Sequence, residues 1–165
     1  MANVLLIGNG AREHAMAQAI ALSAKAPQLF SYMKANNPGI ASLSKRTALG
    51  GYSDPDAIIR FAGDCSVDFA VIGPEDPLNN GIVDALARAG FPSFGPTKSL
   101  ARLETSKTFT RELVTKYNIP GNPVYRIFTS MNGIDEFLHE IGESVIKPDG
   151  LTGGKGVRVQ GDHFQ

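Results

Sequence analysis

Continuous runs of apolar residues, rather than alternating ones, mark the strands that this chain is expected to form. Val4–Ile7 (VLLI) and Phe69–Ile72 (FAVI) are each followed directly by a glycine. Such runs are typical of strands that are buried on both faces of a parallel sheet. Leu29–Met33 is a further candidate strand between them.

Three segments with helical signals alternate with these strands. Arg12–Ala24 is rich in Ala, Met and Leu, which favour helices. Asp54–Ala62 opens with Ser53 or Asp54 as a cap, followed by a proline, and Asn80–Ala89 ends before a glycine. The alternation predicts an α/β fold with a doubly wound, mostly parallel sheet over residues 1–97.

The pattern changes at Phe94–Thr97 (FGPT), where we place the end of the first domain. A helical connector is expected over residues 98–123, and the incomplete start of a second domain over residues 124–165, which is too short to complete a core. The elements expected here are helices over 99–103 and 106–117, a strand over 124–128, a helix over 130–140 capped by Ser130, and a hairpin that pairs 143–147 with 157–160.

The charge balance limits the classes of partner. The 165 residues contain 16 Lys and Arg and 16 Asp and Glu, so the formal net charge is zero. Surfaces that bind nucleic acid or anionic membranes need clustered cations, which argues against both partners and favours small molecules. Cys65 is the single cysteine and has no internal partner for a disulfide. With no apparent signal peptide or membrane-spanning segment, we expect a cytoplasmic protein.

The first candidate site is the segment Gly8–His14 (GNGAREH), at the expected junction of a strand and a helix. Free backbone N–H groups and the helix dipole favour an anion at such a junction. Arg12 adds a charged donor, and Glu13 and His14 add polar groups for a sugar. A dinucleotide site is disfavoured, because Glu13 replaces the third glycine of G-x-G-x-x-G and Lys34 and its neighbours replace the expected acidic residue. A purely structural turn is the alternative.

A second group follows the strand at Phe69–Ile72. The residues Gly73, Pro74 and Glu75 are expected at the same edge of the sheet as Gly8. One carboxylate there could hold ribose hydroxyls or an amine, although helix N-termini favour glutamate for dipole reasons alone.

A glycine-rich stretch, IKPDGLTGGKGV at residues 146–157, is the third candidate. Glycines let backbone N–H groups approach a ligand, and Lys147 and Lys155 supply charge. It is not a Walker A loop, because Gly156 follows Lys155 where that motif needs Ser or Thr. The residues alone leave open a flap over nucleotide phosphates and a flexible hairpin turn.

Together these motifs resemble a known family. GNGAREHA, IGPEDPL, FGPT, LETSKTFTREL and IKPDGLTGGKGV occur in this order, and the chain resembles the phosphoribosylamine–glycine ligase family of the ATP-grasp superfamily along essentially its whole length. The resemblance implies that the sugar-phosphate site includes Gly8, Asn9, Gly10, Arg12, Glu13, His14, Gly73, Pro74 and Glu75. It implies that the nucleotide site includes Lys107, Lys147, Asp149, Gly150, Gly153, Gly154, Lys155 and Gly156.

The resemblance also implies an activity. Such enzymes join glycine to 5-phosphoribosylamine, convert ATP to ADP and phosphate, and serve purine biosynthesis. They are considerably longer than this chain, and their Mg²⁺ or Mn²⁺ ligands are expected outside it. We therefore expect no ligation by the 165-residue chain alone. Alternatives are another ATP-grasp carboxylate–amine ligase and a non-catalytic module that binds a sugar phosphate.

Overall fold

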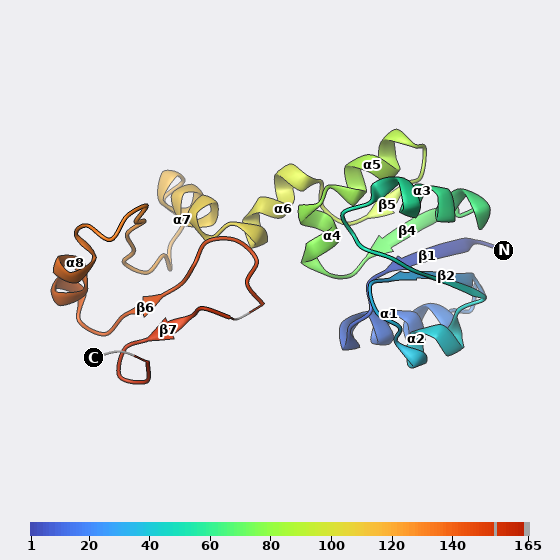
Figure 1. Cartoon of the computed structure of the whole chain (residues 1–165). Coiled ribbons are helices and arrows are strands. Elements are labelled where there is room, and N and C mark those ends of the chain that lie inside the picture. The colour runs from blue at the N-terminus through green and yellow to red at the C-terminus, as the bar shows by residue number, and fades with distance from the viewer. Residues whose placement is uncertain (154, 164–165) are drawn as a thin grey trace. The chain divides into compact units, whose positions relative to one another are not determined.

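A computed structural model describes residues 1–153 and 155–163 (Figure 1). The chain divides into two compact units, Met1–Ala101 and Arg102–Gln165. The strands of the first unit are β1 (Asn3–Ile7), β2 (Gln28–Met33), β3 (Arg46–Leu49), β4 (Phe69–Ile72) and β5 (Ser93–Phe94). Its helices are α1 (Ala11–Ala21), α2 (Pro38–Leu43), α3 (Pro55–Asp64), α4 (Glu75–Asn79), α5 (Ile82–Arg88) and the start of α6 (Lys98–Thr105).

The five strands form one parallel sheet in the order β3-β2-β1-β4-β5. The chain builds outward from β1 through β2 to β3, then crosses to β4 on the other side and continues to β5. This order confirms the doubly wound α/β fold. It also places the reversal of strand order between β1 and β4, where Ile7 is in register with Ile72.

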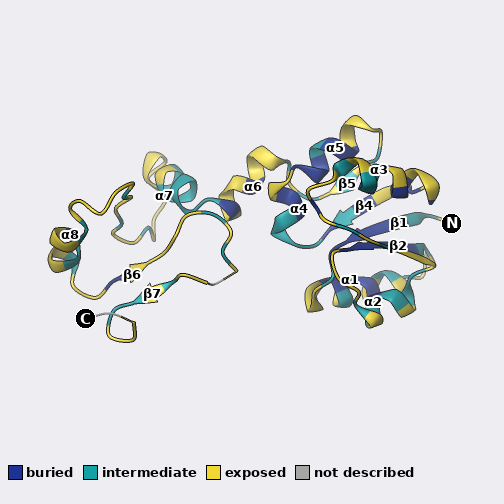
Figure 2. Ribbon diagram, in the orientation of Figure 1, coloured by how far each residue is buried: buried dark blue, intermediate teal, exposed yellow. Residues whose placement is uncertain are grey.

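Each face of the sheet is covered by helices and contributes to its own apolar core (Figures 1 and 2). Along β1 the side chains alternate: Leu5 and Ile7 pack with α3 and α5, whereas Leu6 packs with α1 and α2. All three are fully buried. The continuous apolar run in β1 therefore has the predicted cause, burial on both faces.

The second unit contains the remainder of α6 and α7 (Lys107–Lys116), α8 (Ile134–Ile141), β6 (Val145–Ile146) and β7 (Arg158–Val159). The predicted hairpin is confirmed, because β6 and β7 pair antiparallel, with Val145 opposite Val159. Large apolar side chains of this unit are exposed, including Val124 and Met131. Among the described residues, no helix is long and apolar enough to cross a membrane.

Several elements of the first unit were not predicted from the sequence. The strand β3 has no apolar run and lies at the edge of the sheet, and β5 has only two residues. No helix was predicted around Asn37, but α2 starts there: the Asn37 side chain accepts hydrogen bonds from the N–H groups of Gly39 and Ile40. The five-residue α4 was also missed.

Two predictions for the second unit are wrong. Residues 124–128 form no strand, and Val124 is exposed instead of paired. The helix expected from Ser130 begins at Ile134, after Gly133 with a φ of 79°. The Ser130 hydroxyl accepts a hydrogen bond from Asn132 N–H within a preceding turn. Serine is typical of both a helix cap and a turn, and here Gly133, in the left-handed conformation, sets the start of the helix.

Candidate functional site

The loops that follow β1 and β4 meet at the point where strand order reverses. Gly8 N–H donates to Tyr32 O on one side, and Gly73 N–H donates to Ile7 O on the other. The Arg12 guanidinium donates to Gly73 O at 3.4 Å, which links the first turn of α1 to the loop after β4. The structure therefore brings the segments Gly8–His14 and Gly73–Glu75 together in the crevice where such sheets bind ligands.

Glu13 is the buried centre of this arrangement, with only 3% of its surface exposed. Its Oε2 accepts a hydrogen bond from Gly10 N–H at 2.6 Å, which caps the start of α1. Three glycines give it room: a Cβ added at Gly8, Gly10 or Gly73 would lie 2.5, 2.8 or 2.3 Å from the nearest Glu13 side-chain atom. Glu13 thus determines how closely the two loops approach.

The remaining predicted side chains differ in their surroundings. His14 packs against α2, since a Cβ at Gly39 would lie 2.4 Å from its ring. Pro74 precedes α4 as its N-cap, and Glu75 is the first residue of that helix and half-buried.

Asn9 is fixed by residues that the sequence analysis missed. Its Oδ1 accepts from the Tyr52 hydroxyl at 2.8 Å and from Lys34 N–H at 3.3 Å. Its backbone carbonyl accepts from the Asn37 side chain at 3.0 Å. The Nδ2 donor of Asn9 has no acceptor within residues 1–153 and 155–163. Burial raises the pKa of Tyr52, only partly offset by the hydrogen bond from Lys34 N–H, so its hydroxyl stays a donor.

Lys34 brings a further charge to this edge of the sheet. It follows directly after β2, and its amine lies 3.6 Å from a carboxylate oxygen of Asp76 in α4. The sequence does contain a signal for Lys34, because a residue immediately after a parallel strand lies at the carboxyl edge of the sheet, where ligands bind. Tyr52 gave no such signal, because it lies in an irregular segment beyond the unrecognised β3.

In the second unit, the glycine-rich segment of residues 147–157 connects β6 to β7, and we call it the glycine loop. Asp149 Oδ1 accepts hydrogen bonds from Lys107 N–H at 2.6 Å and Thr108 N–H at 3.3 Å, while Oδ2 accepts from the Ser106 hydroxyl. The Lys107 amine donates to Gly150 O at 2.8 Å. The loop is therefore attached to the N-terminus of α7.

The two predicted lysines of this loop are open to solvent. Lys147 and Lys155 are exposed and form no ion pair with any described residue. Positive φ angles occur at Gly150, Gly153 and Gly156, so the turns need glycine there. Gly154 lies outside the described residues.

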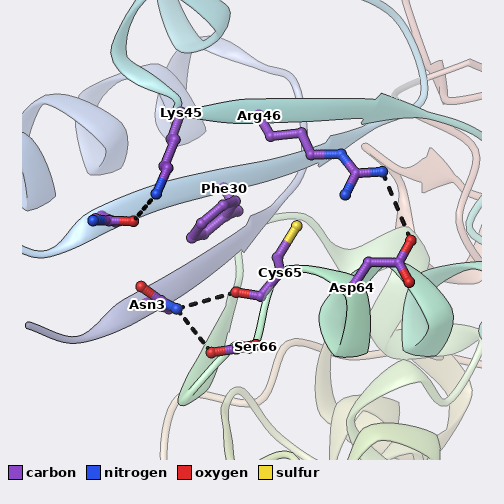
Figure 3. A pocket seen from close by; sticks show the side chains of 8 residues that line it. Asn3, Phe30, Lys45, Arg46, Asp64, Cys65 and Ser66 are labelled. Atoms are coloured by element: carbon purple, nitrogen blue, oxygen red, sulfur yellow. Dashed lines mark hydrogen bonds and ion pairs between the residues drawn. The ribbon is translucent and has the colours of Figure 1, made fainter.

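A separate hollow of about 480 Å³ opens at the amino ends of β1, β2 and β3 (Figure 3). The cations at its rim are engaged within the protein. Lys45 donates to Gln28, and Arg46 lies 3.7 Å from Asp64. Burial raises the pKa of the Cys65 thiol, more than nearby Arg46 lowers it, which favours the protonated thiol. The hollow therefore offers a ligand little free charge.

Substitution of Gly73 by alanine tests the packing around Glu13. The new Cβ would lie 2.3 Å from Glu13 Cγ, so we expect Gly73→Ala to reduce the free energy of unfolding by about 1–3 kcal/mol. The matched control is Gly63→Ala in α3, where a Cβ meets nothing within 4 Å and the change raises helix propensity. Urea denaturation followed by circular dichroism compares them; equal stability of the two variants contradicts the packing account.

Removal of the Tyr52 hydroxyl tests the support of Asn9. Tyr52→Phe deletes its hydrogen bonds with Asn9 and Lys34, with an expected cost of about 1 kcal/mol in unfolding free energy. Tyr32→Phe is the control, because the Tyr32 hydroxyl forms no hydrogen bond within the described residues. The same denaturation measurement applies, and an equal cost for both substitutions would argue against a special role of Tyr52.

The Asp149 contacts predict a pH dependence. Burial raises the pKa of this carboxyl, but hydrogen bonds from the N–H groups of Thr108, Gly150 and Lys107 and from the Ser106 hydroxyl outweigh it, so the pKa lies below its ordinary value of 3.8. A lowered pKa in the folded state stabilises the protein above 3.8, and this contribution is lost as the pH falls through the folded value.

We therefore expect wild type to be more stable than Asp149→Asn at pH 7, with a difference that shrinks as the medium becomes acidic below 3.8. Urea denaturation of both proteins across this range measures the difference. A difference that stays constant with pH would show that the carboxylate charge contributes nothing.

Comparison with known proteins covers both units. Residues 2–104 match the family described as phosphoribosylglycinamide synthetase, N domain. Residues 105–164 match phosphoribosylglycinamide synthetase, ATP-grasp (A) domain. The phosphoribosylamine–glycine ligase of Methanopyrus kandleri is 47% identical over 100% of this chain and 37% of that protein.

Solved structures show the same fold at low sequence identity. The biotin carboxylase domain of Hydrogenobacter thermophilus 2-oxoglutarate carboxylase, in complex with magnesium ADP, has a TM-score of 0.74 at 16% identity, over 95% of this chain and 37% of that one. Phosphoribosylglycinamide synthetase from Anaerococcus prevotii has a TM-score of 0.62 at 14% identity, over 96% and 38%.

The sequence similarity identifies the family more specifically than the structural one, because the Methanopyrus relative is 47% identical and the two solved structures are 16% and 14% identical. The chain spans 37% of the length of its Methanopyrus relative, and the two family matches adjoin at residues 104 and 105. These matches follow the order of the motifs, from the β1 loop to the glycine loop. The chain belongs to the phosphoribosylglycinamide synthetase family.

Proposed function

We infer that this chain supplies the sugar-phosphate and nucleotide-phosphate sites of an enzyme that joins glycine to 5-phosphoribosylamine. ATP would be converted to ADP and phosphate, and glycinamide ribonucleotide would be formed for purine biosynthesis. The observation that carries this proposal is the meeting of Gly8–His14 with Gly73–Glu75 at the reversal of strand order. Membership of the family and the name of the Methanopyrus relative support it.

The phosphate of phosphoribosylamine would bind at the start of α1. The first N–H groups of a helix have no partner within it, and the helix dipole favours an anion there. The exposed Arg12 side chain adds a charge-assisted donor, and its bond to Gly73 O holds it at the crevice. The Asn9 Nδ2, kept in orientation by Tyr52 and Lys34, would donate a further hydrogen bond.

Two carboxylates in the crevice would have different tasks. Glu13 is buried, and its Oε2 accepts the hydrogen bond from Gly10 N–H. It would therefore orient the loop after β1 and offer its other oxygen, Oε1, to a ribose hydroxyl. Glu75 is half-buried at the first position of α4 and would accept from a hydroxyl or from the amine. His14 packs against Gly39 and would contribute shape rather than proton transfer.

The nucleotide phosphates would bind at the glycine loop. Lys147 and Lys155 are exposed and available to neutralise phosphate charge. The Lys107 amine is held beside the loop by its hydrogen bond to Gly150 O. The expected chemistry is phosphorylation of the glycine carboxylate followed by attack of the phosphoribosylamine nitrogen. The residues of this chain would act by positioning substrates and by neutralising phosphate charge. A solved neighbour of the same fold contains magnesium ADP.

The described residues do not fit a complete magnesium site. No group of three or more His, Cys, Asp or Glu side chains comes together in residues 1–153 and 155–163. Mg²⁺ prefers carboxylate and phosphate oxygens with bound water. We therefore assign no metal ligand and no step of the reaction to a metal held by this part of the enzyme.

The sugar-phosphate site is tested with ribose 5-phosphate as the probe. Titration of the chain, followed by calorimetry and by amide NMR signals of Gly8–His14, should show binding. Arg12→Ala should weaken it by about tenfold, the loss of one charge-assisted hydrogen bond. Arg88→Ala, an exposed arginine in the last turn of α5, is the matched control. Equal affinity of wild type and Arg12→Ala would contradict the assignment.

A further inference from the structure

The first turn of α7 is fully engaged within the protein. The N–H groups of Lys107 and Thr108 donate to Asp149, and the N–H of Phe109 donates to the Ser106 hydroxyl at 3.1 Å. The free N–H groups that usually make a helix N-terminus attractive to anions are therefore already satisfied. A phosphate at this place must be held by side chains and by the glycine loop, and α7 itself serves to carry Lys107.

Lys107 is held at two points by neighbouring residues of the loop. Its backbone N–H lies 2.6 Å from Asp149 Oδ1, and its amine lies 2.8 Å from the carbonyl oxygen of Gly150. An ammonium has three donors, so two of them stay available to a ligand. Because Asp149 and Gly150 are adjacent, a shift of the carboxylate also shifts the acceptor of the amine.

Four hydrogen bonds join the described part of the glycine loop, residues 147–153 and 155–157, to another element through a side chain. Three of them are accepted by the Asp149 carboxylate and one is donated by the Lys107 amine, and no other such bond occurs in that part of the loop. Within the loop, Lys155 N–H donates to Thr152 O in a local turn. Bonds from a charged acceptor to backbone donors are stronger than neutral ones, and a negative charge is favoured at a helix N-terminus. The position of the loop relative to α7 therefore depends mainly on Asp149.

We propose that Asp149 is a positioning residue, which holds the Lys107 amine against the glycine loop so that the two bind nucleotide phosphates as one unit. The carboxylate does so through α7, without contacting the nucleotide. This inference rests on the proposed function, in which Lys107 and the loop bind the nucleotide. It gives Asp149 a different task from the direct nucleotide contact that the family resemblance implies.

The first test needs no nucleotide. Limited acylation with acetic anhydride, followed by mass spectrometry, gives the reactivity of the Lys107 amine relative to Lys116 in the same helix. We expect Asp149→Ala to raise this ratio about fivefold, which corresponds to one ordinary hydrogen bond lost at the amine. Asp149→Asn, which retains an acceptor without the charge, should give an intermediate ratio. Asp162→Ala, at an exposed turn, is the control and should match wild type.

The outcome separates positioning from simple capping. If Asp149 only capped α7, Asp149→Ala would accelerate hydrogen exchange at the Lys107 and Thr108 amides without changing the acylation ratio, and the inference would be overturned. Far-UV circular dichroism of each variant checks that the helices remain formed.

The second test uses ADP and a double-mutant cycle. Asp149→Ala should lower ADP affinity about fivefold when Lys107 is present, and leave it unchanged in a Lys107→Met background. The same loss in both backgrounds would overturn the inference, because Asp149 would then act independently of Lys107. If wild type binds no ADP, the proposed nucleotide role of the loop fails, and the acylation ratio alone decides whether Asp149 positions Lys107.

Discussion

The crevice of the first unit depends on one buried carboxylate. Glu13 is almost completely covered, and a buried charge is costly unless hydrogen bonds and a favourable field compensate it. The cap on Gly10 N–H and the N-terminal end of α1 provide both. The glycines at positions 8 and 73 have no side chains to displace it. Loop spacing, helix start and crevice shape follow from this arrangement.

The two candidate sites share one structural feature, a helix start that is capped by a carboxylate. In each, a carboxylate from one segment accepts a backbone N–H at the start of a helix: Glu13 within α1 and Asp149 across to α7. A helix N-terminus that is capped in this way is held in a defined place. Nearby donors such as Arg12 and Lys107 are then presented at fixed points, with less conformational freedom to lose when a ligand binds.

Sequence reasoning succeeded where local physics decides structure. Continuous apolar runs identified β1 and β4, although Phe69 at the start of β4 is exposed. A cap at Ser53 or Asp54 with the following proline identified α3, and the structure has the cap at Asp54. It failed where pairing is imposed from elsewhere. The edge strand β3 shows no hydrophobic period and forms because β2 offers an open edge. The Gly8 and Gly73 loops were predicted to meet, but Tyr52 was missed because its partner Asn9 is 43 residues away.

The bond between Tyr52 and Asn9 has a consequence for the order of folding. The loop after β1 acquires its final support only when the segment beyond β3 has returned to it, across that long sequence separation. Contacts between distant residues form late, because the entropy of closing the intervening chain must be offset first. A newly made chain would therefore acquire a binding-competent crevice only after the outer strand has joined the sheet, so ligand binding would report a completed domain.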